Sequence, residues 1–176
     1  DCGTSIDWYI SVDPVVGQSV LSPTSAPATT WNAMAYSGSI VTFEDNFQTN
    51  MGWDVSSNVS EGAWTRVTPS EGGVRCDAGS DADGSGMCYV TGNSGSEDVD
   101  DGTTTLISPE MPIEEDCNLS YYRWYNNGAN CDGADANNDY FYVDISVDGG
   151  GWTNIETIGP VNESSGGWYH VEHVLS

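Results

Sequence analysis

The chain has 176 residues, of which 38% are apolar and 11% aromatic, enough to build the core of one large domain. It carries 27 acidic residues against three arginines and no lysine, so its formal net charge is -24. Because nucleic acids and anionic membranes are bound through cationic surfaces, this composition argues against both as partners, and no run of about 18 apolar residues is present to span a bilayer.

Short stretches rich in β-branched and aromatic residues recur along the chain, separated by Gly, Asn, Asp and Ser, and no helical periodicity is present. In chain order, the expected strands are residues 6–12, 40–43, 63–67, 87–91, 104–107, 119–125, 140–147, 151–156 and 168–175. The glycines after Asp148 predict a hairpin turn. This spacing predicts an all-β fold, an antiparallel β-sandwich or jelly roll with an N-terminal extended strand segment.

Residues 13–39 differ from the rest of the chain in composition. They hold Pro14, Pro23 and Pro27 together with many Ser, Thr and Ala residues, which is typical of an extended connector. We therefore expect residues 1–39, a terminal strand and its connector, to belong to a different structural unit from residues 40–176.

Five cysteines are spread over the chain without a C-x-x-C pair, which argues against a zinc site and favours structural disulfides in a secreted protein. Several pairings are open. The pairing that we prefer joins Cys76 to Cys88 and Cys117 to Cys131, and it leaves Cys2 with a partner elsewhere.

An ordered series of motifs runs through residues 40–176. Its members are Phe43-Glu44-Asp45-Asn46-Phe47, Gly52-Trp53, Gly62-Ala63-Trp64, Cys88-Tyr89-Val90-Thr91-Gly92-Asn93, Leu106-Ile107-Ser108-Pro109, Leu119-Ser120-Tyr121-Tyr122-Arg123-Trp124-Tyr125 and the run from Asp139 to Gly150. The series resembles the MAM-like jelly-roll modules appended to secreted bacterial proteases and surface proteins. The resemblance implies a non-catalytic module, secreted or on the cell surface, that serves adhesion or ligand binding. Residues 2–12 are similar to the last strands of the Ig-like domain that often precedes such modules.

Members of that family usually continue past the strand that corresponds to residues 168–175. The resemblance therefore implies a jelly roll that is incomplete at its C-terminus. Either the chain is part of a longer protein, or only part of it is resolved, or a neighbouring molecule supplies the strand. Residues 1–12, carried on their connector, would suit a donor strand in a filament built by strand exchange.

Acidic loops are the candidate metal sites. Asp81, Asp83 and Ser85 have the alternating spacing of an EF-hand loop, but the closing Glu is replaced by Gly92. Similar spacing recurs at the oxygen-bearing residues Asp98, Asp100, Asp135, Asn137 and Asp139. Because Ca²⁺ takes about six to eight oxygen ligands, we expect at least one of these loops to bind it; the alternative is a set of solvated acidic turns. The family resemblance implies a further structural Ca²⁺ at Glu44 and Asp45.

Two tryptophans, Trp53 and Trp152, each follow a glycine near a turn and are candidates for stacking on a sugar; most of the others are expected in the core. Asn58 and Asn162 are candidate glycosylation acceptors. No nucleophile elbow or phosphate-binding loop is present, so we expect no enzyme.

The sequence thus predicts an extracellular adhesion or assembly module stabilised by Ca²⁺, whose partner is a surface glycan, a protein or copies of itself. Two alternatives stay open, a carbohydrate-binding module of a secreted hydrolase and a filament subunit.

Overall fold

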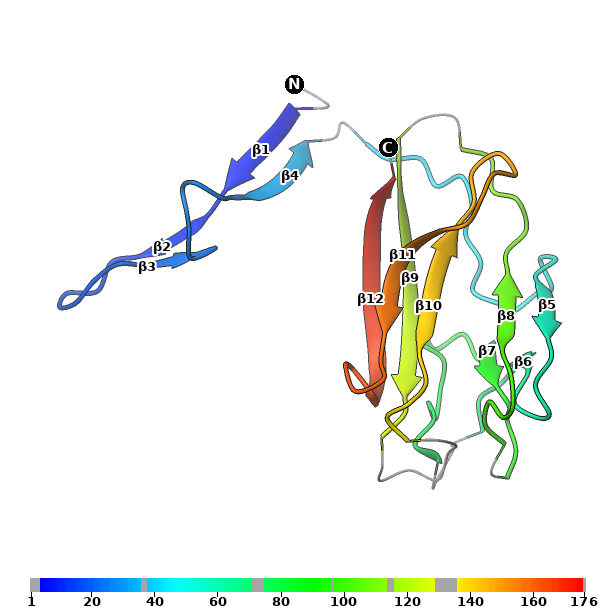
Figure 1. The fold of residues 1–176 in the computed structure, drawn as a ribbon. Coiled ribbons are helices and arrows are strands. Elements are labelled where there is room, and N and C mark those ends of the chain that lie inside the picture. The colour runs from blue at the N-terminus through cyan, green and yellow to red at the C-terminus, as the bar shows by residue number, and fades with distance from the viewer. Residues whose placement is uncertain are drawn as a thin grey trace. The chain divides into compact units, whose positions relative to one another are not determined.

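The computed structural model describes residues 4–35, 38–70, 75–95, 97–113, 116–128 and 136–175 (Figure 1). The chain divides into two compact units, an N-terminal unit, Asp1–Val41, and a C-terminal unit, Thr42–Ser176. The described residues fold into antiparallel β-strands without an α-helix. No helix there is long and apolar enough to cross a membrane.

The strands follow one another as β1 (Thr4–Trp8), β2 (Ile10–Val12), β3 (Val20–Ser22), β4 (Trp31–Ala35), β5 (Asp54–Ser57), β6 (Trp64–Val67), β7 (Cys88–Thr91), β8 (Thr104–Ile107), β9 (Cys117–Asn126), β10 (Phe141–Ile145), β11 (Thr153–Ile158) and β12 (Ser165–Leu175).

The N-terminal unit is a two-stranded ribbon. β1 pairs with β4 and β2 pairs with β3, so residues 20–35 fold back along residues 4–12. The stretch that we expected to be only an extended connector therefore contributes two strands. Its prolines lie in the turns, Pro14 at the tip and Pro23 and Pro27 between β3 and β4, where the lack of an N–H costs no ladder hydrogen bond.

The C-terminal unit is an antiparallel β-sandwich built from the ladders β5–β8, β6–β7, β9–β12 and β10–β11 (Figure 1). Aromatic rings join the ladders. Phe141 of β10 packs edge-on against Trp64 of β6 at 6.2 Å and lies 6.4 Å from Tyr125 of β9. These contacts hold the β6–β7 ladder to the β9 and β10 strands. The jelly-roll order of the strands stays a prediction.

The predicted strand at residues 40–43 does not form. Residues 38–53 contain no strand, and Ile40 and Val41 are exposed. The run is β-branched, but no ladder in the described residues includes it. β5, in contrast, was not predicted, because its sequence is mostly polar; in the structure its four residues are all exposed.

The β10–β11 hairpin confirms the turn predicted after Asp148. Asp148 and Gly149 have φ angles of 52° and 68°, and the Gly150 N–H donates to the Val147 carbonyl at 2.8 Å. Two consecutive left-handed residues form the turn whose twist matches that of the flanking strands, and Asp-Gly is a favoured sequence for it.

Candidate metal centre

Two loops of the sandwich lie side by side because of the strand pairing. β5 pairs with β8 and β6 with β7, so the β5–β6 loop and the β7–β8 loop leave the same end of the ladders. Backbone hydrogen bonds join the loops. The Ser60 N–H donates to the Asp100 carbonyl at 3.0 Å, and the Asp100 N–H donates to the Glu61 carbonyl at 3.4 Å. The backbone thus fixes where the acidic side chains of both loops begin.

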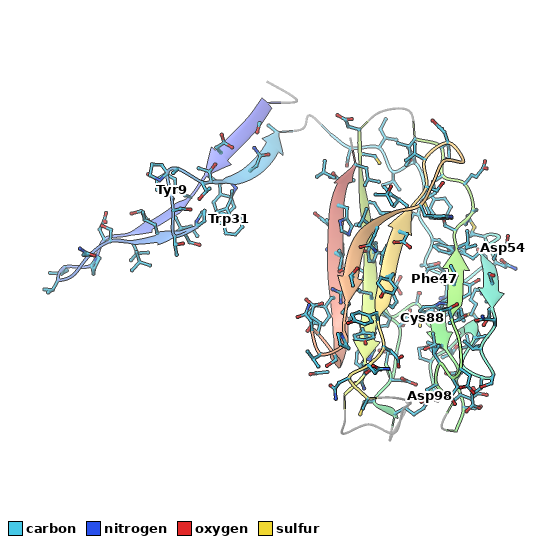
Figure 2. All side chains as sticks on the ribbon, in the orientation of Figure 1. Tyr9, Trp31, Phe47, Asp54, Cys88 and Asp98 are labelled. Atoms are coloured by element: carbon cyan, nitrogen blue, oxygen red, sulfur yellow. The ribbon has the colours of Figure 1, made fainter. Side chains whose placement is uncertain are left out.

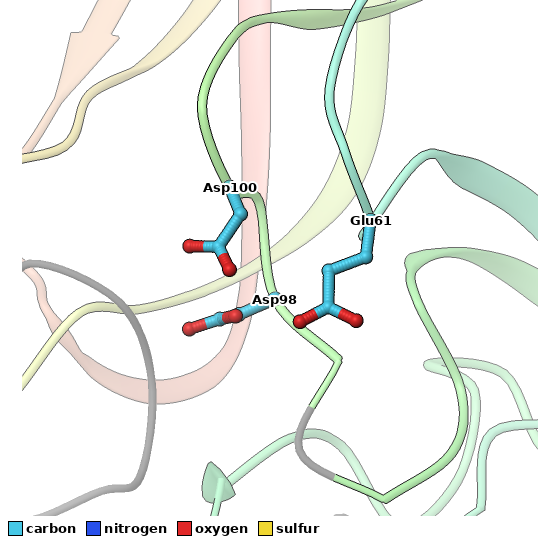
Figure 3. A group of neighbouring side chains, drawn as sticks. All are labelled: Glu61, Asp98 and Asp100. Atoms are coloured by element: carbon cyan, nitrogen blue, oxygen red, sulfur yellow. The ribbon is translucent and has the colours of Figure 1, made fainter.

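Three carboxylates converge from these loops (Figure 3). Glu61 comes from the β5–β6 loop, and Asp98 and Asp100 come from the β7–β8 loop; one oxygen of each lies within 4.8 Å of the others. Glu61 is exposed, while Asp98 and Asp100 are half-buried. Burial, and then the negative charges of Asp100, Glu61 and Asp139, raise the pKa of Asp98 above its ordinary value. Crowded like charges of this kind favour the binding of a cation or a proton.

The three arginines of the chain bond to groups other than the three clustered carboxylates. Arg66 donates to the Phe47 carbonyl at 2.8 Å. Arg75 is buried, pairs with Asp77 at 2.6 Å and also donates to the backbone carbonyl of Glu97, next to Asp98. Arg123 pairs with the acids of β11 and the loop after it. The chain has no lysine, so these arginines are its only permanently cationic side chains. All three bond to other groups of the protein.

Carboxylate oxygens suit a hard divalent cation. Glu61, Asp98 and Asp100 would supply about three of the six to eight oxygens that Ca²⁺ takes, with backbone carbonyls or water for the rest. An open depression of about 560 Å³ adjoins the cluster and is lined by Glu61, Gly62 and Gly92 among others. The arrangement can therefore hold a cation between two loops next to an accessible surface.

The sequence pattern found two members of this cluster, Asp98 and Asp100, and missed Glu61. The loop before β10 carries Asp139, whose negative charge also raises the pKa of Asp98. The Asp139 Oδ2 accepts a hydrogen bond from the Asn127 side chain at 3.0 Å. In the same loop, the Asn137 N–H donates to the Asn127 carbonyl at 2.9 Å. The predicted ligand Asp135 lies outside the described residues.

The loop at residues 81–86 closes on itself. Asp81 is buried, and its Oδ2 accepts hydrogen bonds from the Gly86 N–H at 2.7 Å and from the Ser85 hydroxyl at 2.9 Å. The Ser85 N–H donates to Asp83 at 2.8 Å. The backbone hydrogen bond from Gly86 is the main cause that lowers the pKa of Asp81. The structure thus brings the three predicted ligands together as a hydrogen-bonded turn.

Glu44 and Asp45, the last candidate metal ligands, have different surroundings. Glu44 is exposed, whereas Asp45 links two parts of its own segment. One Asp45 oxygen accepts the Phe47 N–H at 2.7 Å, and the other accepts the indole N–H of Trp53 at 2.8 Å. Trp53 also packs against the rings of Phe47 and Tyr89, at 5.4 Å and 6.1 Å. This residue, predicted as a sugar platform, thus belongs to a half-buried aromatic cluster.

The remaining predicted surface residues are accessible. Trp152, immediately before β11, is 63% exposed. Asn58 and Asn162 are exposed as well, although the Asn58 side-chain oxygen accepts the Thr103 N–H at 2.8 Å.

Both predicted cysteine pairs are wrong. Cys88 and Cys117 carry free thiols, so neither bonds to its predicted partner, Cys76 or Cys131. Cys76 is disulfide-bonded. Cys2 and Cys131 lie outside the described residues. Cys88 is buried within the sandwich, where β7 pairs with β6 (Figure 2). Spacing along the chain does not reveal that location, and so it did not predict the pairing.

A second polar network lies on β9 and was not anticipated. The Arg123 Nε and Nη2 donate to one oxygen of Glu156, at 2.9 Å and 2.7 Å, and Nη2 also contacts Glu163. The Tyr121 hydroxyl donates to the other Glu156 oxygen at 2.6 Å and lies 3.0 Å from His173 Nε2. A lone arginine within an apolar strand was the available signal, because a buried charge requires an acidic partner.

Comparison with protein-family models, with curated proteins and with solved structures gives no match. The resemblance to MAM-like modules stays a prediction.

Proposed function

We propose that the protein is a non-catalytic extracellular module, secreted or on the cell surface, that serves adhesion or assembly and is stabilised by Ca²⁺. The observation that carries this proposal is the convergence of Glu61, Asp98 and Asp100 from two loops. A cation held by all three would join the β5–β6 loop to the β7–β8 loop. The loops at one end of a rigid sandwich are where such modules bind their partners.

The charge of the chain supports an extracellular setting. A folded chain with a net charge of -24 repels itself unless cations screen it. Extracellular Ca²⁺ modules bind weakly, at about 10⁻⁴–10⁻³ M, which suits a partly exposed cluster with few protein ligands. The resemblance to MAM-like modules, and to the Ig-like strands that precede them, agrees with this assignment.

A melting experiment tests the cation. We expect added Ca²⁺ to raise the melting temperature and EDTA to lower it again. Asp98→Asn should reduce the Ca²⁺-induced shift, whereas Asp148→Asn should leave it unchanged. Asp148 is a matched control because it is an exposed turn residue with φ 52°, which Asn adopts readily. A melting temperature that Ca²⁺ does not change would contradict the metal proposal.

Glycan binding is a second candidate, supported by the β10–β11 hairpin. Tyr140 and Tyr142 are exposed and stack with their ring centroids 5.8 Å apart, and Trp152 is exposed at the other end of the hairpin. Aromatic faces of this kind suit sugar rings. Trp152→Ala should weaken retention on insoluble polysaccharide, while Trp53→Ala serves as the comparison. A glycan array without binding would remove this candidate.

A further inference from the structure

One face of the β10–β11 hairpin carries aromatic and polar side chains in a row. Tyr140, immediately before β10, and Tyr142 and Asp144 within it are exposed and alternate with half-buried residues. On β11, Thr157 is the partner of Tyr142, and Asn154 is the partner of Asp144, so both lie on the same face. The face therefore combines ring surfaces with hydrogen-bonding groups.

A β-bulge brings the polar residues of β11 to this face. The register shifts between Val143 and Asp144, which leaves Ile155 as the extra residue of β11. Asn154 and Thr157 are three apart, so a regular strand would point them to opposite faces. With the bulge, the Thr157 hydroxyl donates to Asn154 Oδ1 at 2.9 Å, and Asn154 Nδ2 donates to Asp144 at 2.8 Å. These hydrogen bonds fix the polar groups before any ligand binds.

The aromatic rings of the row are open to solvent. Tyr140 and Tyr142 are 50% and 58% exposed, and their ring planes lie 18° from parallel. Trp152 is 63% exposed, and side-chain alternation carried back from Asn154 sets it on the same face. From Tyr140 to the level of Trp152 the row is about 20 Å long, at roughly 3.4 Å per strand residue. We call this row the hairpin strip; its members are Tyr140, Tyr142, Asp144, Trp152, Asn154 and Thr157.

We infer that the hairpin strip binds a linear, uncharged polysaccharide that lies along the hairpin. This inference names the ligand class for the glycan-binding candidate given above and rests on that candidate. Exposed tyrosine and tryptophan rings offer apolar faces at a wet surface, which suit the C–H faces of sugar rings. One Asp144 oxygen is bonded to Asn154, and the other accepts no hydrogen bond from the described residues. Sugar hydroxyls are donors that such an oxygen can accept.

Charge decides the class of polysaccharide. The strip holds no cationic side chain, and a chain with a net charge of -24 repels an anionic polymer. A cationic polymer would bind acidic residues over the whole chain and would not need the rings. An uncharged polymer is therefore the one whose binding depends on the strip.

The shape of the strip argues against a protein partner. An added peptide strand pairs with the edge of a sheet through its backbone, whereas the strip lies on the face of the hairpin. A folded partner needs about 800 Å² on each side. Three half-exposed rings offer only roughly 300 Å². A narrow row of this length suits a chain of sugar rings instead.

Affinity electrophoresis of the full-length chain tests the inference. Native gels contain hydroxyethylcellulose, glucomannan or arabinoxylan, whose backbones are uncharged, or alginate, which is anionic. We expect at least one uncharged polymer to retard the protein and alginate not to. Tyr142→Ala and Asp144→Ala should each weaken the affinity at least about tenfold, through loss of a ring face and of a charged acceptor. Tyr9→Ala is the matched control, since Tyr9 is 46% exposed but belongs to the N-terminal unit.

The outcomes separate this inference from the functions on which it rests. Retardation that Tyr142→Ala leaves unchanged, or that Tyr9→Ala reduces as much, would overturn the strip while glycan binding stood. Stronger retardation by alginate would overturn the uncharged class. No retardation by any polymer would remove both the inference and the glycan candidate. Retardation that survives EDTA supports the strip even if the metal proposal fails, because none of the three clustered carboxylates belongs to it. Circular dichroism checks that the variants keep the wild-type spectrum.

Discussion

Gly62 lies against the backbone of Asp98 so closely that a Cβ atom at Gly62 would stand 1.9 Å from the Asp98 carbonyl oxygen. Gly62 is buried and has a φ of 78°, so both its conformation and its surroundings require glycine. This contact places the β5–β6 loop directly on the β7–β8 loop, and Glu61 is therefore carried next to Asp98. The acidic cluster depends on a glycine that bears no ligand.

Replacement of Gly62 by alanine should therefore be strongly destabilising. We expect Gly62→Ala to lower the free energy of unfolding by more than about 3 kcal/mol, because backbone must move as well as adopt a strained φ. Gly52→Ala is the matched control, since Gly52 has a φ of 92° and nothing within 4 Å of its Cβ position. That change should cost only about 1 kcal/mol in urea unfolding. Equal losses in both variants would show that the loop contact does not matter.

Strands could be predicted where the signal is local. The alternation over residues 119–125 predicted β9, and the structure extends it only to Cys117–Asn126. The Asp-Gly pair after Val147 predicted a hairpin for the same reason, because turn chemistry lies within a few residues. β5 was missed because its polar residues form a strand only through pairing with β8, far along the chain.

The candidate site was predicted in part for the same physical reason. Asp98 and Asp100 could be proposed from their spacing, but Glu61 joins them only through the packing of two loops. Asp81 shows how a metal-loop spacing can instead form a hydrogen-bonded turn. Its acidic motif is real, yet its oxygens bond to Ser85 and Gly86 of its own turn, which spacing alone does not distinguish from a metal loop.

The burial of Asp98, and then its repulsion by the other acids, should lower stability in buffer free of divalent cations. The pKa of Asp98 is raised above its ordinary value of 3.8, so its protonated form favours the folded state. The favourable contribution of that protonated form is present at low pH and is lost as the pH rises through the raised pKa. At pH 7, Asp98→Asn should therefore stabilise the metal-free protein by about 0.5 kcal/mol, and the gain should shrink toward pH 4. Asp148→Asn should show no such gain in urea unfolding; a destabilised Asp98→Asn would contradict the prediction.

Cys88 and Cys117, the free thiols among the described residues, should differ in reactivity. Burial, and then the charge of Asp81, raise the pKa of Cys88 to about 11 from the ordinary 9.0. At pH 8 this shift leaves about a hundredfold less thiolate than at an ordinary cysteine, and the buried sulfur is also inaccessible. We expect iodoacetamide to label Cys117 in the native protein and to label Cys88 only after unfolding, as measured on the separated peptides by mass spectrometry. Rapid native labelling of Cys88 would show that the β6–β7 region is open.

The ion pair between Arg123 and Glu156 should matter far more than a surface pair. Their side chains are 6% and 15% exposed, and loss of one partner leaves the other charge buried. Glu156→Gln should lower the free energy of unfolding at pH 7 by about 2–4 kcal/mol. Glu172→Gln is the control: Glu172 is 66% exposed and lies 3.8 Å from His170, so its replacement should cost less than about 0.5 kcal/mol.

The pH dependence of this pair has a defined sign. Burial acts to raise the pKa of Glu156, but the hydrogen bonds from Arg123 and Tyr121 outweigh it and lower the pKa below its ordinary value of 4.5. A carboxyl group with a lowered pKa contributes stability above its unfolded pKa and loses it as the pH falls through the folded one. The difference between wild type and Glu156→Gln, measured by urea unfolding, should therefore be constant from pH 7 to about pH 5 and shrink below it. A difference that persists unchanged at pH 3 would mean that packing, rather than the charge of Glu156, stabilises this part of the sandwich.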